Sequence, residues 1–159
     1  MTPGRRSAGL LLFRRAPAGT EVLVAHMGGP FWAKKDAGAW SLPKGEHGPD
    51  EEPLHAARRE FREELGLDPP AGPFVPLGEL RQRGGKRISA WAVEADLDPA
   101  AVRPGIFELE WPPRSGRTQA FPEVDRVAWL GLGEAREKLV PGQVGFVDAL
   151  ERWLTGPGR

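Results

Sequence analysis

The chain has 159 residues, a length typical of a single domain, and its 22 basic and 22 acidic residues leave no net charge. This balance argues against nucleic-acid binding through overall charge, so any anion site must be a local basic cluster. The absence of cysteine excludes disulfides, thiol nucleophiles and zinc–thiolate sites, and no apolar run reaches the roughly 20 residues of a membrane-spanning helix.

The first third of the chain predicts two strands, a loop and an extended segment. Residues 7–14 and 21–27 have the apolar character of buried strands, joined by a turn around residues 17–19. Residues 28–39 are expected to form a loop. Residues 40–45 are expected to be extended, because the proline among them bars a helix.

The clearest predicted helix covers residues 53–65. Its apolar stripe repeats at helical spacing and consists of Leu54, Ala57, Phe61 and Leu65. The acidic residues 50–52 precede the helix and suit the positive end of its dipole, and Gly66 is a natural stop.

The remainder of the chain predicts further strands and two helices. The expected strands are 74–82, 86–95, 106–111 and 124–130, the expected helices are 134–139 and 144–154, and residues 112–118 are expected to form an exposed loop. This order favours an α/β fold with a mixed β-sheet and helices on both faces. We therefore expect one soluble, cytoplasmic domain over residues 1–159, and the sequence gives no oligomeric state.

The chemistry is concentrated in residues 45–67, GEHGPDEEPLHAARREFREELGL. Glu60, Glu63 and Glu64 stand at i, i+3 and i+4 of the predicted helix, so they project from one face. Like charges at this spacing repel, and a divalent cation reverses the sign of that interaction; Mg²⁺ commonly takes carboxylates together with substrate phosphates. The alternative interpretation is a solvated charged face held by pairs such as Arg59–Glu63.

This segment resembles the signature of the Nudix hydrolases. Seven positions match in type and spacing: Gly45, Glu51, Arg59, Glu60, Glu63, Glu64 and Gly66. The resemblance implies an α/β/α sandwich and a metal-dependent attack of water on a nucleoside diphosphate linked to another group. It also implies that Glu60, Glu63 and Glu64 bind Mg²⁺ or Mn²⁺ with the main-chain carbonyl of Lys44 beside Gly45. Glu51 and Arg59 would complete the catalytic set by bracing loop and helix.

A second resemblance covers residues 121–130, FPEVDRVAWL. It is similar to a proline–glutamate stretch before a Trp-containing strand in bacterial dinucleoside polyphosphate hydrolases and RNA pyrophosphohydrolases. A glutamate reaches the metal site from that stretch, and by position it would be Glu123. Glu108 and Glu110 are alternatives, since strand 106–111 could turn one of them inward, and Glu123 could also be a plain surface residue.

Candidate substrate-binding residues are basic or aromatic. The basic candidates for phosphate binding are Lys44, Arg6, Lys86 and Arg87, although the last two could equally form a solvated hairpin tip. The aromatic candidates for base stacking are Trp32, Trp40, Trp91 and Phe121, although each could belong to the core. The histidines His26, His47 and His55 are isolated, and we expect no ligand role for them.

The expected substrate is a small nucleotide, with no sign of a membrane or a nucleic-acid partner. A hydrolase of nucleoside or dinucleoside polyphosphates is favoured by the residues 121–130 and by the local basic residues. Two alternatives are a hydrolase of ADP-ribose or other sugar nucleotides and a nucleotide-binding module without activity. The intact acidic positions argue against the inactive module.

Overall fold

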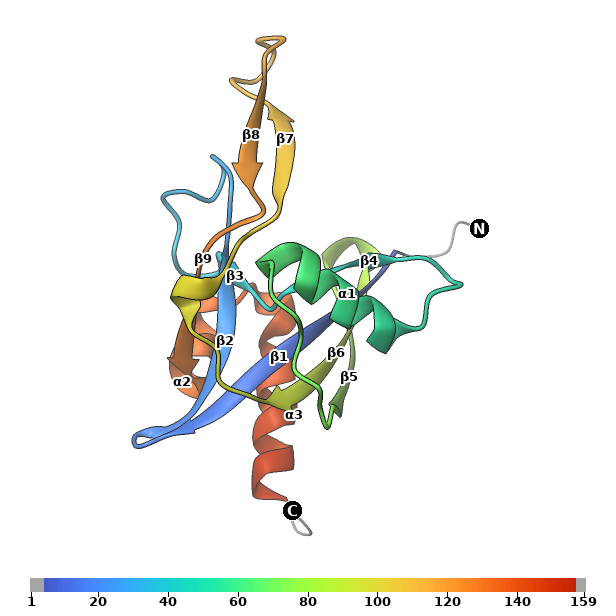
Figure 1. Ribbon diagram of the computed structural model, residues 1–159, viewed down its shortest axis with the longest axis vertical. Coiled ribbons are helices and arrows are strands. Elements are labelled where there is room, and N and C mark those ends of the chain that lie inside the picture. Colours follow the sequence, from blue (N-terminus) through green and yellow to red (C-terminus); the bar gives the residue numbers. More distant parts are fainter. Residues whose placement is uncertain (1–4, 157–159) are drawn as a thin grey trace.

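The computed structural model describes residues 5–156, which form a mixed β-sheet with helices on both faces (Figure 1). Residues 1–4 and 157–159 of the predicted domain lie outside the described residues. The seven strands of the sheet are β1 (Arg6–Ala16), β2 (Gly19–Met27), β3 (Trp40–Ser41), β4 (Lys44–His47), β5 (Val75–Arg81), β6 (Arg87–Glu94) and β9 (Val124–Gly131). The helices are α1 (Pro53–Leu65), α2 (Leu132–Lys138) and α3 (Val144–Thr155), with short 3₁₀ turns at Arg83–Gly85, Pro99–Ala101 and Pro141–Gln143.

Strand β1 organises the sheet, whose order is β3-β2-β1-β6-β5, with β9 on β2 and β4 on β1. One edge of β1 pairs in parallel with β6 along residues 6–13. Its other edge is shared: residues 6–9 pair with β4, and residues 13–16 pair with β2, both antiparallel. The sharing places β4, which carries Lys44 and Gly45, beside the beginning of β1.

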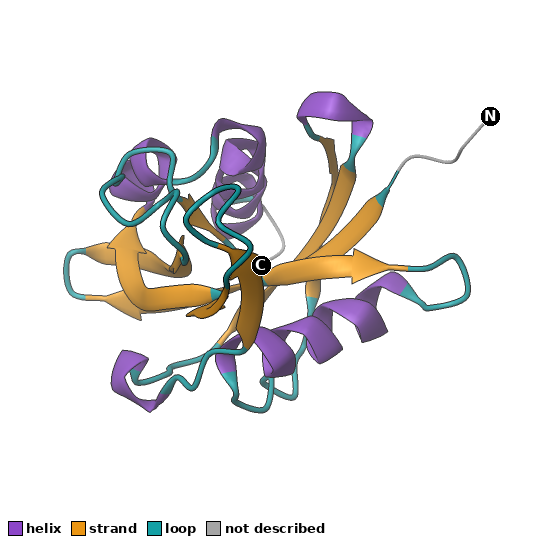
Figure 2. Ribbon diagram, turned by 90° about the horizontal axis from the view of Figure 1, so that it is seen from above, coloured by secondary structure: helices purple, strands orange, loops and turns teal. Residues whose placement is uncertain are grey.

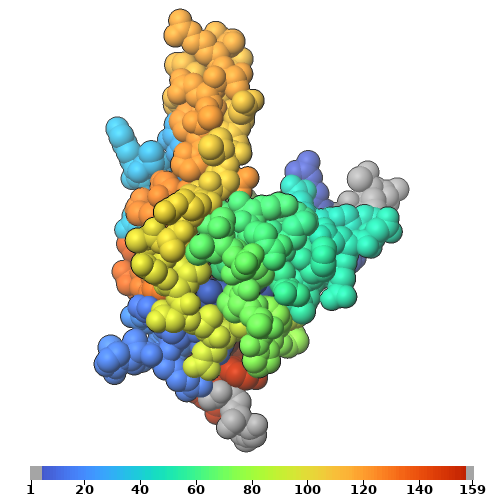
Figure 3. Space-filling view, in the orientation of Figure 1, coloured from blue at the N-terminus to red at the C-terminus, as the bar shows by residue number. Residues whose placement is uncertain are grey.

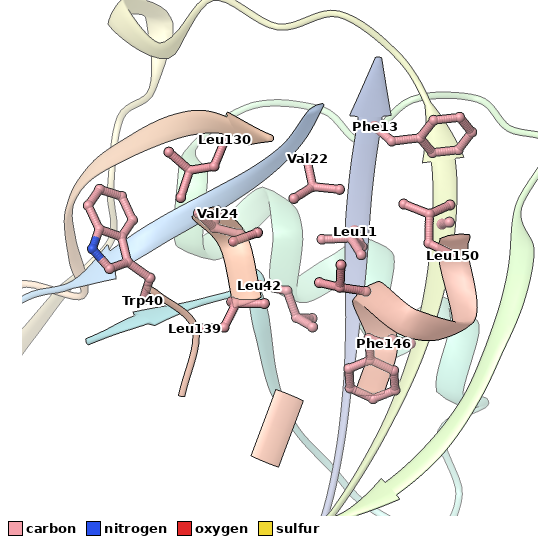
Figure 4. Packing of buried hydrophobic residues seen from close by; sticks show 14 of the residues in the cluster. Leu11, Phe13, Val22, Val24, Trp40, Leu42, Leu130, Leu139, Phe146 and Leu150 are labelled. Atoms are coloured by element: carbon pink, nitrogen blue, oxygen red, sulfur yellow. The ribbon is translucent and has the colours of Figure 1, made fainter. Parts of the chain in front are cut away.

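The core has two layers because successive residues of β1 point to opposite faces of the sheet. Leu10 and Leu12 belong to the apolar cluster that includes buried residues of α1, and Leu11 and Phe13 belong to the cluster that includes buried residues of α3. Figure 4 shows the second cluster, and Figure 2 shows α1 on one side of the sheet with α2 and α3 on the other. The predicted α/β fold with helices on both faces is therefore confirmed.

Helix α1 has the predicted bounds, and its apolar stripe faces the sheet. Ala57, Phe61 and Leu65 are fully buried. Gly66 ends the helix in the left-handed conformation, with φ 70°, and its N–H donates to the carbonyl of Arg62 at 2.8 Å. With the apolar face fixed against β1, the opposite side of the helix is available for the charged residues.

One element departs from the expectation. Residues 112–118 form the predicted exposed turn, but the chain then continues into an unpredicted strand, β8 (Thr118–Pro122). Strand β8 pairs antiparallel with β7 (Ile106–Glu110) in a separate two-stranded sheet. The sequence TQAFP lacks the apolar alternation that marks a half-buried strand, because most of β8 is exposed.

The helices are short by membrane standards. None of those in residues 5–156 combines the length and the apolar character that a transmembrane span requires.

Candidate active site

The signature segment brings a helical carboxylate against the backbone of β4. Gly45 lies in β4 opposite Ala8 of β1, and its α-carbon faces the side chain of Glu60 on α1. A Cβ at this position would overlap the Glu60 carboxylate. Glycine at position 45 thus leaves room for the Glu60 carboxylate against the strand, and a larger residue would displace that carboxylate.

The carboxylates of Glu60 and Glu64 are partly withdrawn from water. Burial raises the pKa of Glu64 to about 8, with the negative charges of Glu123 and Glu60 adding to the rise and Lys44 opposing it. Burial also raises the pKa of Glu60, and the charge of Glu63 adds to this rise. The negatively charged forms of the two carboxylates are therefore destabilised, and a bound cation would stabilise them.

Lys44 is the cation of this acidic group. Its pKa is lowered, first by burial and then by the neighbouring charge of Lys86, while Glu64 and other carboxylates oppose the shift. Lys44 therefore lies beside the glutamates, and the charge of Lys86 is close enough to affect its pKa.

Glu123 joins the cluster from outside the signature. The N–H of Glu123 donates to the carbonyl of Gly105 at 2.8 Å, and the N–H of Gly105 donates to the main-chain carbonyl of Glu64 at 3.3 Å. This bridge places Glu123 beside the last turn of α1, where partial burial and the charge of Glu63 raise its pKa. Glu108 and Glu110, the alternatives to Glu123, are exposed on β7 and do not join the cluster.

Glu51 and Arg59 form the expected brace. The Nε and Nη2 atoms of Arg59 each donate to a different oxygen of Glu51 at 2.8 Å, and the hydrogen bonds with Arg59 hold the pKa of Glu51 at about 2. Arg59 also reaches Glu63, with Nη1 3.1 Å from Oε2. The Arg59–Glu63 pair that a plain charged face would contain is thus present together with the brace.

The donor set fits a hard divalent cation, which prefers carboxylate and carbonyl oxygens. Within residues 5–156, no three His, Asp or Glu side chains already converge closely enough to enclose a metal ion. The fit rests on two other observations: Gly45 leaves room for the Glu60 carboxylate, and burial together with the charges of neighbouring glutamates raises the pKa of Glu60 and Glu64.

Other predicted phosphate ligands lie farther from the glutamates. Arg6 lines a recess of about 470 Å³ with Glu51 and other residues of the loop between β4 and α1, but no glutamate of α1 lines it. Arg87 is exposed, and its Nη1 lies 3.4 Å from Glu79 of β5. Of the predicted basic residues, Lys44 is the one whose charge interacts with Glu60 and Glu64, and Lys86 acts on Lys44.

The structure corrects the expectation for Trp40. Its indole is buried in the core, its Nε1 donates to Asp36 at 2.9 Å, and the ring contacts His26 edge to face. The ring is therefore unavailable for stacking on a base. Trp32 and Trp91 also pack against the core clusters.

The remaining aromatic candidate lies outside the core. Phe121 lies on β8 next to Phe107, with ring centroids 6.0 Å apart.

Two polar anchors near the site were missed at the sequence level. His26 is fully buried; its Nε2 donates to the carbonyl of Lys35 at 2.6 Å, and its Nδ1 lies 2.9 Å from Asp125. Gln143 is also buried and accepts from the N–H of Leu42 at 3.0 Å, which fixes the segment before Lys44. Neither has a local sequence signal, because each partner lies far away in the chain or on a loop.

A family model described as NUDIX domain matches residues 3–150. An RNA pyrophosphohydrolase from Gluconacetobacter diazotrophicus is 39% identical over 69 residues, which cover 42% of this chain and 39% of that protein. The chain thus spans well under half the length of this relative.

Solved structures agree on the fold. A C. elegans Ap4A hydrolase in a binary complex matches with a TM-score of 0.64 at 18% identity, over 96% of this chain and 98% of that chain. The NUDIX domain of Shewanella oneidensis NrtR, complexed with ADP ribose, matches with a TM-score of 0.67 at 16% identity, over 98% and 91%. Because the family model extends over nearly the whole sequence and these structures share its fold, the chain belongs to the NUDIX domain family.

Proposed function

We propose that this protein is a metal-dependent hydrolase that cleaves a diphosphate linkage in nucleoside or dinucleoside polyphosphates. The observation that carries the proposal is the partly buried cluster of Glu60, Glu64 and Glu123 beside Lys44, where burial raises the pKa of each carboxyl group and the charges of neighbouring glutamates add to the rise. Such a group of acids gains stability when a cation and an anionic substrate bind together.

Each part of the cluster has a distinct role. Glu60, Glu63, Glu64 and Glu123 would hold the metal, together with the main-chain carbonyl of Lys44. When bound there, Mg²⁺ or Mn²⁺ would supply positive charge that neutralises the diphosphate and would lower the pKa of a water molecule. The ammonium group of Lys44 orients the phosphates, and Arg59 keeps the loop and helix in register through Glu51. The proton of the attacking water passes to a carboxylate of the coupled cluster.

The substrate class is supported by two kinds of relative. The partial relative is named an RNA pyrophosphohydrolase, and one structural neighbour is named an Ap4A hydrolase; both names describe cleavage next to a chain of phosphates. The NrtR domain bound to ADP ribose favours a second candidate, an ADP-ribose or sugar-nucleotide pyrophosphatase. Lys44 beside the cluster, with the charge of Lys86 acting on it, favours the first, since a polyphosphate carries more negative charge than a diphosphate.

A product screen with Mg²⁺ tests this proposal. It compares dinucleoside polyphosphates, nucleoside triphosphates, ADP-ribose and 5′-triphosphorylated RNA, with products separated by anion-exchange chromatography. We expect the highest kcat/KM on a substrate with three or more linked phosphates. A clear preference for ADP-ribose would support the second candidate, and binding without turnover of any substrate would support the inactive module.

A further inference from the structure

The β7–β8 hairpin projects beyond the main sheet and contacts the loop between β2 and β3 through the rings of Phe107 and Trp111. Figure 1 shows it projecting from the end of the sheet, and Figure 3 shows open space beside it above the surface of α1. Among the described strands, β7 and β8 pair only with each other. An isolated two-stranded hairpin is marginally stable in water, so a projecting hairpin of this kind is expected to gain from a bound partner.

The two faces of the hairpin differ in chemistry, because alternate residues of a strand point to opposite sides. Phe107 lies opposite Phe121 in the ladder, and Trp111 lies opposite Arg117, which gives one face an aromatic and basic character. The other face of β7 carries Ile106, Glu108 and Glu110, all exposed. A polyanionic ligand is attracted to the first face and repelled by the second.

The loop between β2 and β3 packs on the aromatic face. The α-carbon of Gly29 faces the ring of Phe107, and the rings of Phe31 and Trp111 meet edge to face with centroids 5.3 Å apart. Phe31 is nevertheless 59% exposed, one of two large hydrophobic residues exposed in the described chain. We call the set Phe31, β7, β8 and the turn between these strands the aromatic arm.

The end of the aromatic arm carries two cations. The guanidinium groups of Arg114 and Arg117 form no ion pair with any residue in the range 5–156, and the main chain of Arg114 has a φ of 62°. Positive φ is uncommon for residues with a side chain and marks a locally constrained turn. Two arginines without an ion pair in the described residues, on a hairpin that carries half-buried aromatic rings and contacts the exposed Phe31, match the chemistry of a nucleotide, which offers phosphate oxygens and a flat base.

The aromatic arm is continuous with the glutamate cluster. Pro122 ends β8 and Glu123 follows it directly, and the N–H of Gly28 donates to the carbonyl of Glu123 at 3.0 Å. Arg117 lies six residues before Glu123, which corresponds to about 20 Å along an extended strand at ~3.3 Å per residue. This separation suits a ligand that extends well beyond the phosphates held at the cluster.

We propose that the aromatic arm binds the far nucleoside of a dinucleoside polyphosphate whose phosphates lie at the glutamate cluster. The inference rests on the proposed function and narrows its substrate class. The far base stacks on Phe31 and Trp111, Arg117 lies on the same face of the hairpin as these rings, and the acidic face of β7 is turned away from the ligand. A single nucleoside triphosphate has no second nucleoside and does not use the arm.

The test compares a dinucleoside tetraphosphate with the matching nucleoside triphosphate as substrates for Phe31→Ala, Arg117→Gln and the wild-type protein. Loss of stacking on one base typically lowers affinity by about 10-fold or more. We expect Phe31→Ala to raise KM for the dinucleoside by about this factor with little change in kcat. Its kcat/KM for the triphosphate should stay within about twofold, and Phe31→Tyr should restore the wild-type KM.

The matched control is Arg152→Gln, an exposed charge change on α3, far from the hairpin in Figure 1. It should leave both substrates unaffected. Equal losses on both substrates in Phe31→Ala, or no loss on either, would overturn the arm proposal.

Binding of a methylene-bridged dinucleoside tetraphosphate, measured by calorimetry with Mg²⁺, separates this inference from the proposed function. If the wild-type protein cleaves neither substrate but binds the analogue through Phe31, the hydrolase proposal fails and the arm proposal stands. If it cleaves both and Phe31→Ala binds the analogue normally, the reverse holds.

Discussion

At the scale of single residues, the three glutamates of α1 have different surroundings although they share one helix face. Glu64 is the most buried and its carboxylate faces Lys44, Glu60 lies against the backbone at Gly45, and Glu63 is exposed and paired with Arg59. The spacing in the sequence predicts the shared face but not these differences, which depend on where β4 and the segment around Glu123 lie against the helix.

Glu60→Gln and Glu64→Gln test the metal face. Each substitution keeps the side-chain volume and removes one negative charge, so we expect kcat to fall by a factor of ~10² or more, the usual scale for losing a main electrostatic element. Without metal, the melting temperature should be unchanged or slightly higher, because repulsion between neighbouring carboxylates is relieved. The measurements are steady-state kinetics and thermal unfolding in EDTA; near-full activity in both variants would remove this helix from the metal site.

Glu51→Gln tests the brace separately. The folded pKa of Glu51, about 2, lies below its ordinary value of 4.5, so the charged form contributes stability above pH ~4.5 that is lost as the pH falls toward 2. We therefore expect the variant to melt below the wild-type protein at pH 7, and the difference to shrink between pH 5 and pH 2. The catalytic defect should be smaller than that of Glu60→Gln. A difference that does not depend on pH would show that the Arg59 pair contributes nothing.

At the scale of secondary-structure elements, α1 and the first strands follow from the sequence because their apolar periodicity is strong. The strand β8 does not, since most of its residues are exposed and only pairing with β7 defines it. The sequence is also insufficient for Trp40, which is expected at the binding site but is buried in the core. Its position after a loop is compatible with a surface role, and only the packing of β3 against β2 shows that its ring is in the core.

The loop between β2 and β3 depends on one buried histidine. The carbonyl of Lys35 can only accept, so His26 Nε2 donates to it, while Nδ1 contacts Asp125 at the start of β9. We expect His26→Ala to reduce the free energy of unfolding by ~2 kcal/mol or more, because it leaves buried polar groups unpaired and a cavity beside Trp40.

Hydrogen exchange can locate this effect. The amides of residues 28–38 should exchange faster in His26→Ala than in the wild-type protein, relative to the amides of α3. Lys35→Ala is the matched control, because it keeps the accepting carbonyl and removes an exposed side chain. Equal protection of the loop in His26→Ala and the wild-type protein would show that other contacts hold it.

At the scale of the whole molecule, the sheet order explains why distant segments meet at one site. Because β1 shares one edge between β2 and β4, the segment with Lys44 lies under α1, and Gly105 ties α1 to the residue after β8. The signature predicts the residues that bring Lys44 to α1. It does not predict the contact between α1 and Glu123, which depends on the path of the chain between β6 and β9. The sequence alone therefore does not distinguish Glu123 from Glu108 and Glu110.

We propose that this cluster hydrolyses a diphosphate linkage only with a divalent cation, so turnover must depend on added metal. The rate of dinucleoside tetraphosphate hydrolysis is measured by product separation in EDTA, then after titration with Mg²⁺ and with Mn²⁺. We predict no turnover in EDTA and full recovery with either ion, with ¹⁸O from labelled water in one product. Undiminished turnover in EDTA would show that hydrolysis does not require a divalent cation and would contradict the proposed mechanism.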